Sequence, residues 1–548
     1  MTDKDPVSAE WSPRTTPHSQ PAEPWPLDPV LVLGNGPVGQ TAALLLARWG
    51  VPTIVLDQRA ERDLVGSKAI CQQRDVLDVW ESVGARVAEL GVTWTTARTF
   101  YRDQELFAVT MTDPGRSPLP PFVNISQCRT EQLLDERIAA SPLIDVRWGH
   151  GVESVSQEAD GVTLRGGGFT LRTPYLLLCA GARADGLRAQ LGVTLDGHSF
   201  DDRFLICDIR ASLAGWASER RFYFDPAWNP GRQVLIHPCP DSTYRIDWQV
   251  PPDYDLDAEV ASGALDQRVR AILGDVPYEI EWKSVYRFHT RCVDRMRLGR
   301  VLLAGDAAHL YAPFGARGLN SGVADAENAA WKIAFAGRGW APEELLESYH
   351  RERHAAAREN VEVTTATMDF LVPQSAAAAA HRRDVLARAR TDAAARAMVD
   401  SGRLSEPFWY TDSPLTTPDP TRPFAGRPPR GAAPPPGPGV IVPDLPVAGG
   451  GSLRGLCRNG LLVLAAPGAS VDVPVRTPAP VRVVAMTSLS TDLPGVLSAR
   501  AGELWLIRPD AHVAAVVADE ARLRDALCRV VGLAERREDE DGLLPAVG

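Results

Sequence analysis

Short apolar runs alternate with helix-like stretches in the first part of the chain. Residues 30–33 (VLVL) form an apolar run, residues 41–49 have a helical composition, and residues 53–56 (TIVL) form a second run ending at Asp57. Four-residue β-branched runs on either side of a helical stretch are typical of parallel strands joined by a crossover helix. The pattern predicts a βαβ unit over residues 29–57.

The middle of the chain has the pattern of a sheet. Three aromatic and β-branched runs, at residues 221–224, 233–237 and 244–250, are separated by turns rich in Pro, Gly, Asp and Asn. Another apolar run at 300–304 then leads into a glycine turn. Helical composition follows in three stretches, 322–336, 343–370 and 375–399, the last of which we interpret as a surface helix.

The last part of the chain is separated from the rest by composition. Residues 413–446 are crowded with Pro and Gly, which is typical of an interdomain connection. Beyond them, strand-like runs at 460–465, 481–485 and 503–507 precede a helical stretch at 519–531. At 548 residues the chain is too long for one hydrophobic core, so we expect two or three domains.

Charge and cysteine usage exclude several classes of protein. The formal net charge of −11, without a cluster of Lys and Arg, argues against a nucleic-acid partner. The eight cysteines form no C-x-x-C pair, which fits neither a zinc site nor a disulfide framework and suits a reducing compartment. Because no segment has the pattern of a signal peptide or membrane span, we expect a cytoplasmic protein without a membrane partner.

A G-x-G-x-x-G motif lies between the first strand and the first helix. It consists of Gly34, Asn35, Gly36, Pro37, Val38 and Gly39. In such a motif the first glycine permits a tight turn, the second lets the backbone approach a pyrophosphate, and the third lets helix and strand pack closely. Asp57, about twenty residues on, is placed with Gln58 to bind a ribose. The motif predicts a dinucleotide site without identifying the nucleotide.

A second motif follows the run at 300–304. Gly305-Asp306-Ala307-Ala308-His309 is followed by Pro313-Phe314-Gly315-Ala316-Arg317-Gly318-Leu319-Asn320 and by a helical stretch. Here the chain resembles the single-component FAD-dependent aromatic hydroxylases, whose FAD fold is of the glutathione-reductase type. The resemblance implies that Asp306 binds the ribitol. It further implies that the loop from Pro313 to Gly318, Leu319 and Asn320 covers the pyrophosphate and isoalloxazine.

The resemblance extends over nearly the whole chain after its start. Lys68 lies where the family has a basic residue near FAD, and Gln127 lies on a helix that contributes a glutamine to the cofactor. Residues 222–226, 229–231 and 245–249 are similar to the 3-(3-hydroxyphenyl)propionate hydroxylase branch. Residues 506–513 resemble that branch's C-terminal domain, a thioredoxin-like fold without redox cysteines.

One segment departs from the family pattern. The family's middle motif is a Cys-Asp-Gly run that contributes to both FAD and NAD(P)H binding, whereas this chain has Cys179-Ala180-Gly181 followed by Arg183. Gly181 remains available for FAD, but Ala180 offers no charged acceptor. Asp185, five residues beyond Ala180, could compensate in a rearranged turn.

The implied fold class is α/β, with a Rossmann-like FAD-binding domain of glutathione-reductase type, an interleaved sheet domain and a thioredoxin-like C-terminal domain. The expected ranges are a disordered leader at 1–28, FAD-binding parts at 29–200 and 286–412, a substrate-binding sheet at 201–285, a Pro- and Gly-rich connection at 413–440, and the thioredoxin-like domain at 441–548.

The implied activity is hydroxylation of a phenolic or polycyclic aromatic substrate with NADH or NADPH and O2, through a flavin hydroperoxide. The catalytic base is not evident from the sequence. Tyr223, His237, Tyr286 and His289 are candidates by position, although such residues are more often packed in a core. His309 fits a scaffold role beside the flavin motif. His350 and His354 share a helix face without an H-E-x-x-H motif, so we expect no metal.

Three alternatives remain open from the sequence. An antibiotic- or polyketide-tailoring oxygenase could use the same flavin for Baeyer–Villiger or epoxidation chemistry. The change to Ala180 would also suit a reductase-poor flavoprotein that binds a reactive intermediate. A flavin-dependent halogenase would share the fold, but its W-x-W-x-I-P segment is absent. A homodimer is compatible with the chain.

Overall fold

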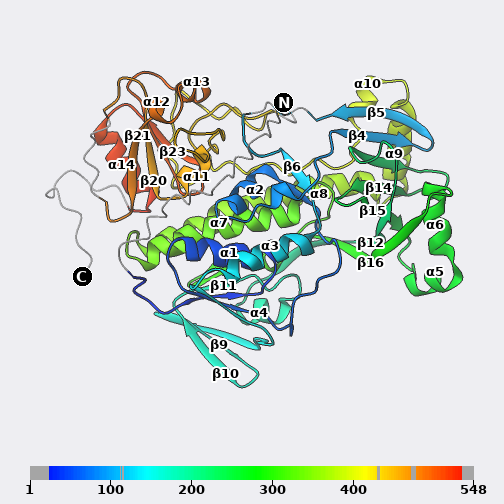
Figure 1. Cartoon of the computed structure of the whole chain (residues 1–548), viewed down its shortest axis with the longest axis horizontal. Coiled ribbons are helices and arrows are strands. Elements are labelled where there is room, and N and C mark those ends of the chain that lie inside the picture. The colour runs from blue at the N-terminus through cyan, green and yellow to red at the C-terminus, as the bar shows by residue number, and fades with distance from the viewer. Residues whose placement is uncertain (1–23, 112, 114–115, 429–431, 471–476, 534–548) are drawn as a thin grey trace, which may run out of the picture.

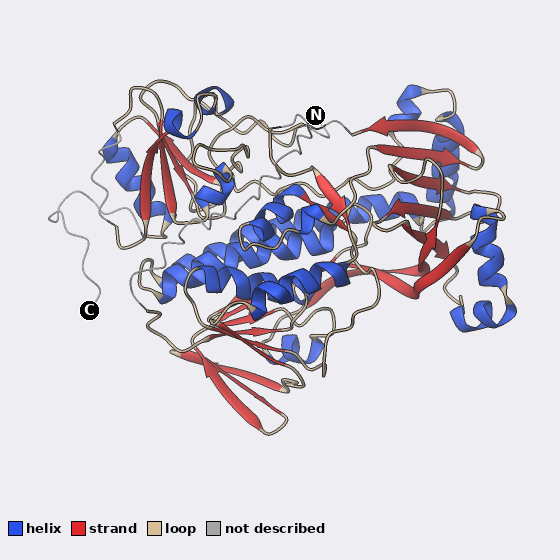
Figure 2. Cartoon of the chain, in the orientation of Figure 1, coloured by secondary structure: helices blue, strands red, loops and turns tan. Residues whose placement is uncertain are grey.

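The computed structural model describes residues 24–111, 113, 116–428, 432–470 and 477–533. Of the expected leader, residues 1–23 lie outside the described residues. Long helices occupy the centre of the molecule, and sheets lie around them (Figure 2). The eight-stranded sheet and the C-terminal domain lie at opposite sides of these helices (Figure 1).

A six-stranded sheet carries the predicted βαβ unit. The apolar runs form β1 (Val30–Leu33) and β2 (Thr53–Leu56), joined by α1 (Pro37–Arg48). The sheet order is β17 (Arg297–Leu298), β18 (Val301–Leu303), β11 (Leu176–Leu178), β1, β2 and β7 (Ile144–Arg147). All neighbours are parallel except β17 and β18. A parallel sheet is covered on both faces, which explains why β1, β11 and β18 are wholly buried.

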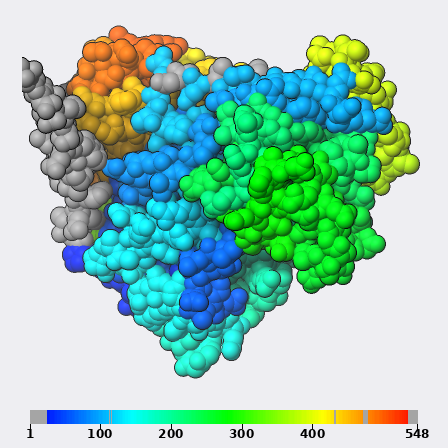
Figure 3. All heavy atoms as spheres, turned by 45° about the vertical axis from the view of Figure 1, so that its right-hand side comes forward, coloured from blue at the N-terminus to red at the C-terminus, as the bar shows by residue number. Residues whose placement is uncertain are grey.

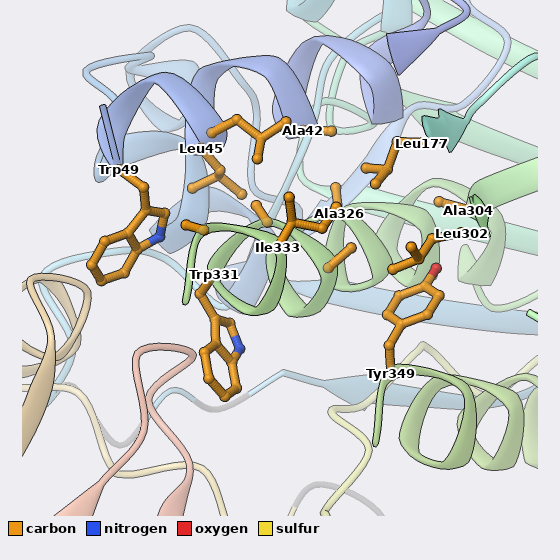
Figure 4. Packing of buried hydrophobic residues seen from close by; sticks show 14 of the residues in the cluster. Ala42, Leu45, Trp49, Leu177, Leu302, Ala304, Ala326, Trp331, Ile333 and Tyr349 are labelled. Atoms are coloured by element: carbon orange, nitrogen blue, oxygen red, sulfur yellow. The ribbon is translucent and has the colours of Figure 1, made fainter. Parts of the chain in front are cut away.

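Helix α7 (Arg317–Gly337) lies against α1 and is the most deeply buried long element. Seventeen of its 21 residues are buried, including Ala326, Asn328 and Lys332. Small residues allow it to approach α1 closely, and apolar side chains fill the space above the sheet. Figure 4 shows this packing for Ala42 and Leu45 of α1, Ala326 and Ile333 of α7, and Leu177 and Leu302 of the sheet.

The eight-stranded sheet contains the three strands predicted in the middle of the chain. Its order is β19 (His309–Leu310), β16 (Tyr278–Val293), β12 (Leu195–Ala211), β15 (Thr243–Val250), β14 (Gln233–Pro238), β13 (Glu219–Phe224), β4 (Thr96–Tyr101) and β5 (Gln104–Thr110). Strand β4 pairs in parallel with β13, although the paired residues, such as Thr96 and Glu219, lie 123 positions apart in the chain (219 − 96). Residues 96–110, from the range expected for the first FAD-binding part, therefore complete this sheet.

The long strands β12 and β16 were not evident in the sequence pattern. Half of β12 is exposed or intermediate, and most of β16 alternates between exposed and intermediate positions. Charged residues occupy those exposed positions, so the hydrophobic signal of a strand is weak there. Pairing between β12 and β16, rather than local pattern, holds these segments extended.

The two faces of this sheet bury different clusters. One face packs on α5 (Leu256–Ser262) and α6 (Ala264–Leu273) through Ile246 and Trp248. The other face packs Phe204 and Phe222 against Phe314, which belongs to the loop of the second motif. In Figure 3 the part of the chain that contains β13–β16 and α5–α6, in green, forms one side of the surface in that view.

Helices α8 (Glu347–Leu371), α9 (Ala376–Arg388) and α10 (Ala393–Ala397) follow α7. The stretch interpreted as a surface helix forms α9 and α10, and α9 buries Leu386 in the cluster around Phe314. The remaining helices of this part are α2 (Arg74–Glu81), α3 (Gln127–Ala139) and α4 (Asp185–Gln190). The smaller sheets are β3 (Cys71–Gln73) with β6 (Phe122–Asn124), and β8 (Ser154–Glu158) with β9 (Gly161–Gly166) and β10 (Phe169–Thr173).

The C-terminal part contains a four-stranded mixed sheet. Its order is β21 (Val481–Ala485), β20 (Leu461–Ala465), β22 (Leu504–Ile507) and β23 (Val513–Val517). Three of these strands match predicted runs, and α14 (Glu520–Val530) matches the predicted helix. Short helices complete this part: α11 (Leu453–Cys457), α12 (Met486–Leu489) and α13 (Leu493–Val496). Among the described residues, no helix is both long and apolar enough to cross a membrane.

The central packing predicts a large effect of truncating α7. Ile333 is fully buried, so Ile333→Ala should lower the free energy of unfolding by about 2–5 kcal/mol through lost transfer energy and a cavity. Val260→Ala, at a 44% exposed site on α5, should change stability by no more than about 0.5 kcal/mol. Urea denaturation of both variants would measure this. Equal stability losses would contradict the packing described for α7.

Candidate functional site

The three motif glycines occupy three different environments. Gly34 has φ +109°, and a Cβ there would lie 2.3 Å from the Cys179 carbonyl oxygen. A Cβ on Gly39 would lie 1.9 Å from the Gly34 carbonyl oxygen, so only glycine lets α1 begin this close to β1. At Gly36 a Cβ would meet no described atom within 4 Å. The turn is therefore tightly packed at its ends and open in the middle, as backbone approach by a pyrophosphate requires.

Asp57 closes the far side of this turn. Its carboxylate accepts hydrogen bonds from the backbone amide of Asn35 (2.9 Å) and from the backbone amide and guanidinium of Arg59 (2.9 and 2.8 Å). Burial alone would raise the pKa of Asp57, but these hydrogen bonds lower it. The carboxylate is therefore ionised and oriented beside the turn.

Both features line one cavity of about 360 Å³. Gly34 and Gly36 form its floor at the turn, and Asp57, Gln58 and Arg59 form one wall. The opposite wall comes from the middle motif, which differs from the family pattern at Ala180, and from the residues after it. These residues are Cys179, Ala180, Gly181, Arg183, Gly186 and Leu187. The size and the mixture of polar and apolar walls suit part of a nucleotide.

The second motif brings the start of α7 onto the start of α1. Gly305 has φ +59°, and a Cβ on it would lie 3.0 Å from Val38 Cγ2. A Cβ on Gly322 would lie 2.5 Å from the same methyl and 3.2 Å from the Gly305 Cα. Gly318, in the first turn of α7, has open space at its Cβ position within the described chain. Two helix N-termini, each a site of partial positive charge, therefore point toward one region.

Asp306 lies at this junction. Solvent reaches its side chain, although its neighbours on both sides, Gly305 and Ala307, are buried. The surrounding chain desolvates the carboxyl and raises its pKa, while His309 acts in the opposite direction. An accessible carboxyl with dense protein around it is typical of the floor of a deep cleft.

Asp325 supports the Asp306 turn from beneath. Its carboxylate accepts hydrogen bonds from the Gly305 amide (3.0 Å) and the Arg353 guanidinium (2.7 Å) and lies 2.6 Å from His309 Nε2. Burial opposes ionisation, but the interactions with His309 and the Arg353 guanidinium and the hydrogen bond from the Gly305 backbone amide lower the pKa of Asp325. His309 also stacks on Tyr311, and all its contacts are those of a scaffold residue.

The first turn of α7 is tied to the strand that precedes α2. The Asn320 amide donates to the Cys71 carbonyl (3.0 Å), and its oxygen accepts from the Gln73 amide (2.9 Å). Leu319 is buried beside it, and Gly315 in the preceding loop approaches the Arg403 carbonyl so closely that a Cβ would lie 2.1 Å away. The loop from Pro313 to Asn320 is thus held on both sides.

Lys68 and Gln127 lie together at another edge of the same region. Lys68 has φ +43°, and its ammonium lies 3.7 Å from Asp63. The Gln127 amide donates to Glu131 (3.0 Å), and its oxygen accepts from the Ala69 amide (3.3 Å). The structure therefore brings both predicted residues to the loop before β3.

The four candidate bases do not lie together. Tyr223 stacks on Phe100 and belongs to the cluster under α5 and α6, on the sheet face opposite Phe222. It is therefore turned away from Phe314 and the second motif. His289 pairs with Ser199 Oγ (2.8 Å), and Tyr286 is 36% exposed near Trp282.

His237 lies on the opposite face of the sheet from Tyr223, as does Tyr286, which pairs with Phe204 in the β12–β16 register. His237 lies two residues after Leu235 on β14, so both side chains face the cluster that contains Phe314. Burial, with nearby Arg220 and Arg245, lowers the pKa of His237 well below its usual value. Its Nδ1 is buried and has no hydrogen-bond partner among the described residues. His237 is thus a neutral imidazole with a free acceptor or donor on the inner face.

Two arginines near the site make contacts that the sequence did not predict. Arg62 donates to the Asn35 backbone carbonyl (3.0 Å) and pairs with Glu131 (3.1 Å). Arg245, in the run 245–249, pairs with Asp247 (2.8 Å) and donates to the Lys68 carbonyl. Asn35, Glu131 and Lys68 lie far from these arginines in the sequence, so no local motif could have identified those contacts.

The structure also shows the positions of Asp185 and of the pair His350 and His354. Asp185 does not face the cavity: its carboxylate pairs with Arg188 (2.6 Å) and is 85% exposed. His350 and His354 contact the backbone of Met296 and Val293. Within the described ranges, no group of three or more His, Cys, Asp or Glu side chains could hold a metal ion.

The contact at Gly322 can be tested by substitution and rescue. Gly322→Ala should push α7 from α1, destabilise the fold by about 1–3 kcal/mol and weaken FAD binding at least tenfold, because its Cβ would overlap Val38. Adding Val38→Ala should restore part of the binding. Gly495→Ala, where a Cβ has open space, is the control. Fluorescence titration of apoprotein with FAD measures the dissociation constants. Normal binding by Gly322→Ala would refute the close contact.

Comparison with known proteins agrees with this geometry. The family model described as "FAD binding domain" matches residues 28–364. The 3-(3-hydroxy-phenyl)propionate/3-hydroxycinnamic acid hydroxylase of Mycobacterium sp. (strain KMS) is 29% identical over 359 residues, 64% of this chain and 61% of the relative. The rifampicin monooxygenase of Streptomyces venezuelae is 31% identical over 356 residues, 62% of this chain and 71% of the relative.

A solved structure covers more of the chain. The flavin-dependent monooxygenase PieE, in complex with FAD and substrate, superposes with a TM-score of 0.81 at 25% identity, covering 92% of this chain and 98% of that one. The match to the mycobacterial hydroxylase spans less than two thirds of that relative's length. The family model itself matches more than half of this chain. The chain therefore belongs to the FAD binding domain family, and its cofactor is FAD.

Proposed function

We propose that this protein is an FAD-dependent monooxygenase that hydroxylates a phenolic or polycyclic aromatic substrate, with NADH or NADPH and O2. The proposal rests on one observation. The N-termini of α1 and α7 meet at closely packed glycines, next to the aromatic face of the eight-stranded sheet. When bound, FAD supplies the redox chemistry, taking a hydride from the nicotinamide and activating dioxygen. The names and functions of the relatives point to the same reaction class.

The cofactor contacts follow from the two motifs. We assign the pyrophosphate to the open turn and the helix start after it, the ribose to the wall of the cavity, and the ribitol to Asp306. The assigned residues are Gly34, Gly36, Pro37, Val38, Gly39, Asp57, Gln58, Lys68, Gln127, Gly181, Asp306, Pro313, Gly318, Leu319 and Asn320. Open Cβ positions at Gly36, Gly181 and Gly318 support three of these assignments, since an open position lets the cofactor approach the backbone.

The inner face of the eight-stranded sheet is the proposed substrate side. Phe204, Phe222 and Phe288 lie on this face against Phe314. Aromatic side chains bind flat rings by stacking and edge contacts and also exclude water from the reacting atoms. This composition favours an aromatic ring over a sugar or a charged acid as the reacting group.

His237 is the candidate that best fits proton transfer from a phenol. Its lowered pKa keeps the imidazole neutral at physiological pH, so the tautomer protonated at Nε2 can accept a hydrogen bond from the phenol hydroxyl at Nδ1. Arg245, its partner in the β14–β15 register, would favour a phenolate on the same face. Removing the phenolic proton makes the ring more electron-rich and therefore a better nucleophile toward activated oxygen.

The proposal extends to the domains. The six-stranded parallel sheet with α1 and α7 supports a glutathione-reductase-type FAD domain made from both halves of the chain. The mixed sheet β20–β23 with α14 supports a thioredoxin-like C-terminal domain. Its two cysteines, Cys457 and Cys528, do not form a C-x-x-C motif, which supports a role other than thiol exchange.

The decisive experiment concerns Ala180. The family's middle motif has an aspartate at this position and contributes to NAD(P)H binding, whereas Ala180 offers no carboxylate. We expect NADH or NADPH to reduce the bound flavin under anaerobic conditions, faster when an aromatic ligand is present, because the other cofactor contacts are intact. One charge-assisted hydrogen bond is worth only about 1.5–3 kcal/mol. Stopped-flow absorbance with and without a panel of phenols and polycyclic quinones measures this. Reduction by dithionite but by neither nicotinamide would favour the intermediate-binding flavoprotein instead.

A further inference from the structure

The C-terminal domain inserts three buried arginines toward the flavin-binding part of the chain. Arg454 is the second residue of α11, Arg458 directly follows the helix, and Arg508 follows β22. Their exposed fractions are 6%, 4% and 0%. A guanidinium is rarely buried so deeply unless charged partners compensate it. The partners of these arginines therefore mark where the domain is coupled to the rest of the molecule.

Arg508 joins the domain to α8. Its guanidinium pairs with Glu352 (Nη2 to Oε2, 2.9 Å) and with Asp510 of its own domain (Nη2 to Oδ2, 2.6 Å). The Lys332 ammonium of α7 lies 2.6 Å from the same Glu352 oxygen. The Trp331 indole donates to Asp510 (3.3 Å). Helices α7 and α8 and the C-terminal domain thus share one buried ion cluster.

The cluster continues to the flavin motif through Tyr410. The Asn328 amide donates to Glu352 (2.7 Å) and to the Tyr410 hydroxyl (3.3 Å). The Arg353 guanidinium donates to the same hydroxyl (3.1 Å) and to Asp325 (2.7 Å), which holds the Gly305 amide. The cluster is charge-balanced: its three carboxylates are Asp325, Glu352 and Asp510, and its three cations are Lys332, Arg353 and Arg508.

A second route, also made of ion pairs, leads from the C-terminal domain to α2 and α7. Arg458 pairs with Asp78 of α2 (2.8 Å) and with Glu327 of α7 (2.7 Å). Arg454 pairs with Asp75 in the first turn of α2. Helix α2 begins directly after β3, the strand to which Asn320 of α7 is hydrogen-bonded. Both routes therefore end at elements that meet at the start of α7.

We propose that the C-terminal domain positions the flavin site, with Arg508, Arg458 and Tyr410 as positioning residues that hold the start of α7 and the Gly305 turn in place. The proposal rests on the proposed placement of FAD at Asp306 and the start of α7. Buried ionic networks resist partial disruption, because removing one partner leaves another charge uncompensated at low dielectric. Loosening the network would displace the backbone donors and the Asp306 carboxylate that face the cofactor.

The mildest test removes only the Tyr410 hydroxyl. Tyr410→Phe keeps the buried ring but removes the acceptor that joins Arg353 to Asn328. We expect the dissociation constant of FAD to rise at least threefold and the visible circular dichroism of the bound flavin to change. Tyr278→Phe, on the outer side of β16, should change neither quantity. Both are measured on the full-length chain, well below its melting temperature.

Arg508 gives the stronger test. Arg508→Gln should raise the FAD dissociation constant at least tenfold, and Arg508→Lys, which retains the charge, should restore part of the affinity. Arg522→Gln, which replaces an arginine with a 70% exposed side chain on α14, is the control within the same domain. If Arg508→Gln does not fold, Arg508→Lys and Tyr410→Phe decide the question.

The outcomes distinguish failure of the proposed function from failure of the positioning role. Wild-type apoprotein that does not bind FAD would overturn the proposed function itself. Wild-type binding together with folded Tyr410→Phe and Arg508→Lys variants that retain its FAD affinity and visible circular dichroism would overturn only the positioning role. Weakened binding with an altered flavin spectrum in both variants, and in neither control, supports it.

Discussion

The close contact of Val38 with Gly305 and Gly322 is the constraint on which the site depends. It lets the N-termini of α1 and α7 meet at one cleft, which no larger residue at either glycine would permit. Two helix N-termini brought together repel each other, since each carries partial positive charge. In the proposed site, a bound pyrophosphate and the Asp306 carboxylate would supply the negative charge that makes this arrangement favourable. The same contact would then serve both the packing of the helices and the binding of the cofactor.

Next to the contact of Val38 with Gly305 and Gly322, buried charged side chains are compensated by other protein groups rather than by solvent. Asp325 orients the Gly305 turn, and Arg353 links it to residues that lie far along the chain. Such a network gives little net stability, because desolvation offsets much of the attraction, but it specifies one arrangement of its members. The cofactor-facing surface is therefore held by side chains that never reach the cofactor.

The sequence predicted what local pattern encodes. The unit of β1, α1 and β2 follows from apolar runs around a glycine turn, and the motif glycines have the environments that their spacing implied. The addition of β4 and β5 to the eight-stranded sheet depends on long-range pairing, which has no local signal. The same holds for Arg508, whose partner Glu352 lies 156 residues away. Tyr223 lies on the sheet face opposite the Phe314 cluster, which its position on a predicted strand could not reveal.

The central claim is that one cleft binds both halves of FAD, the adenosine half beside Asp57 and the flavin half beside Asp306. Calorimetric titration of apoprotein with FAD and with FMN tests it most directly, because FMN lacks the adenosine half. The account predicts one FAD per chain and FMN binding at least a hundredfold weaker. FMN binding as tight as FAD would contradict it, since the turn at Gly36 and the cavity beside Asp57 would then contribute nothing.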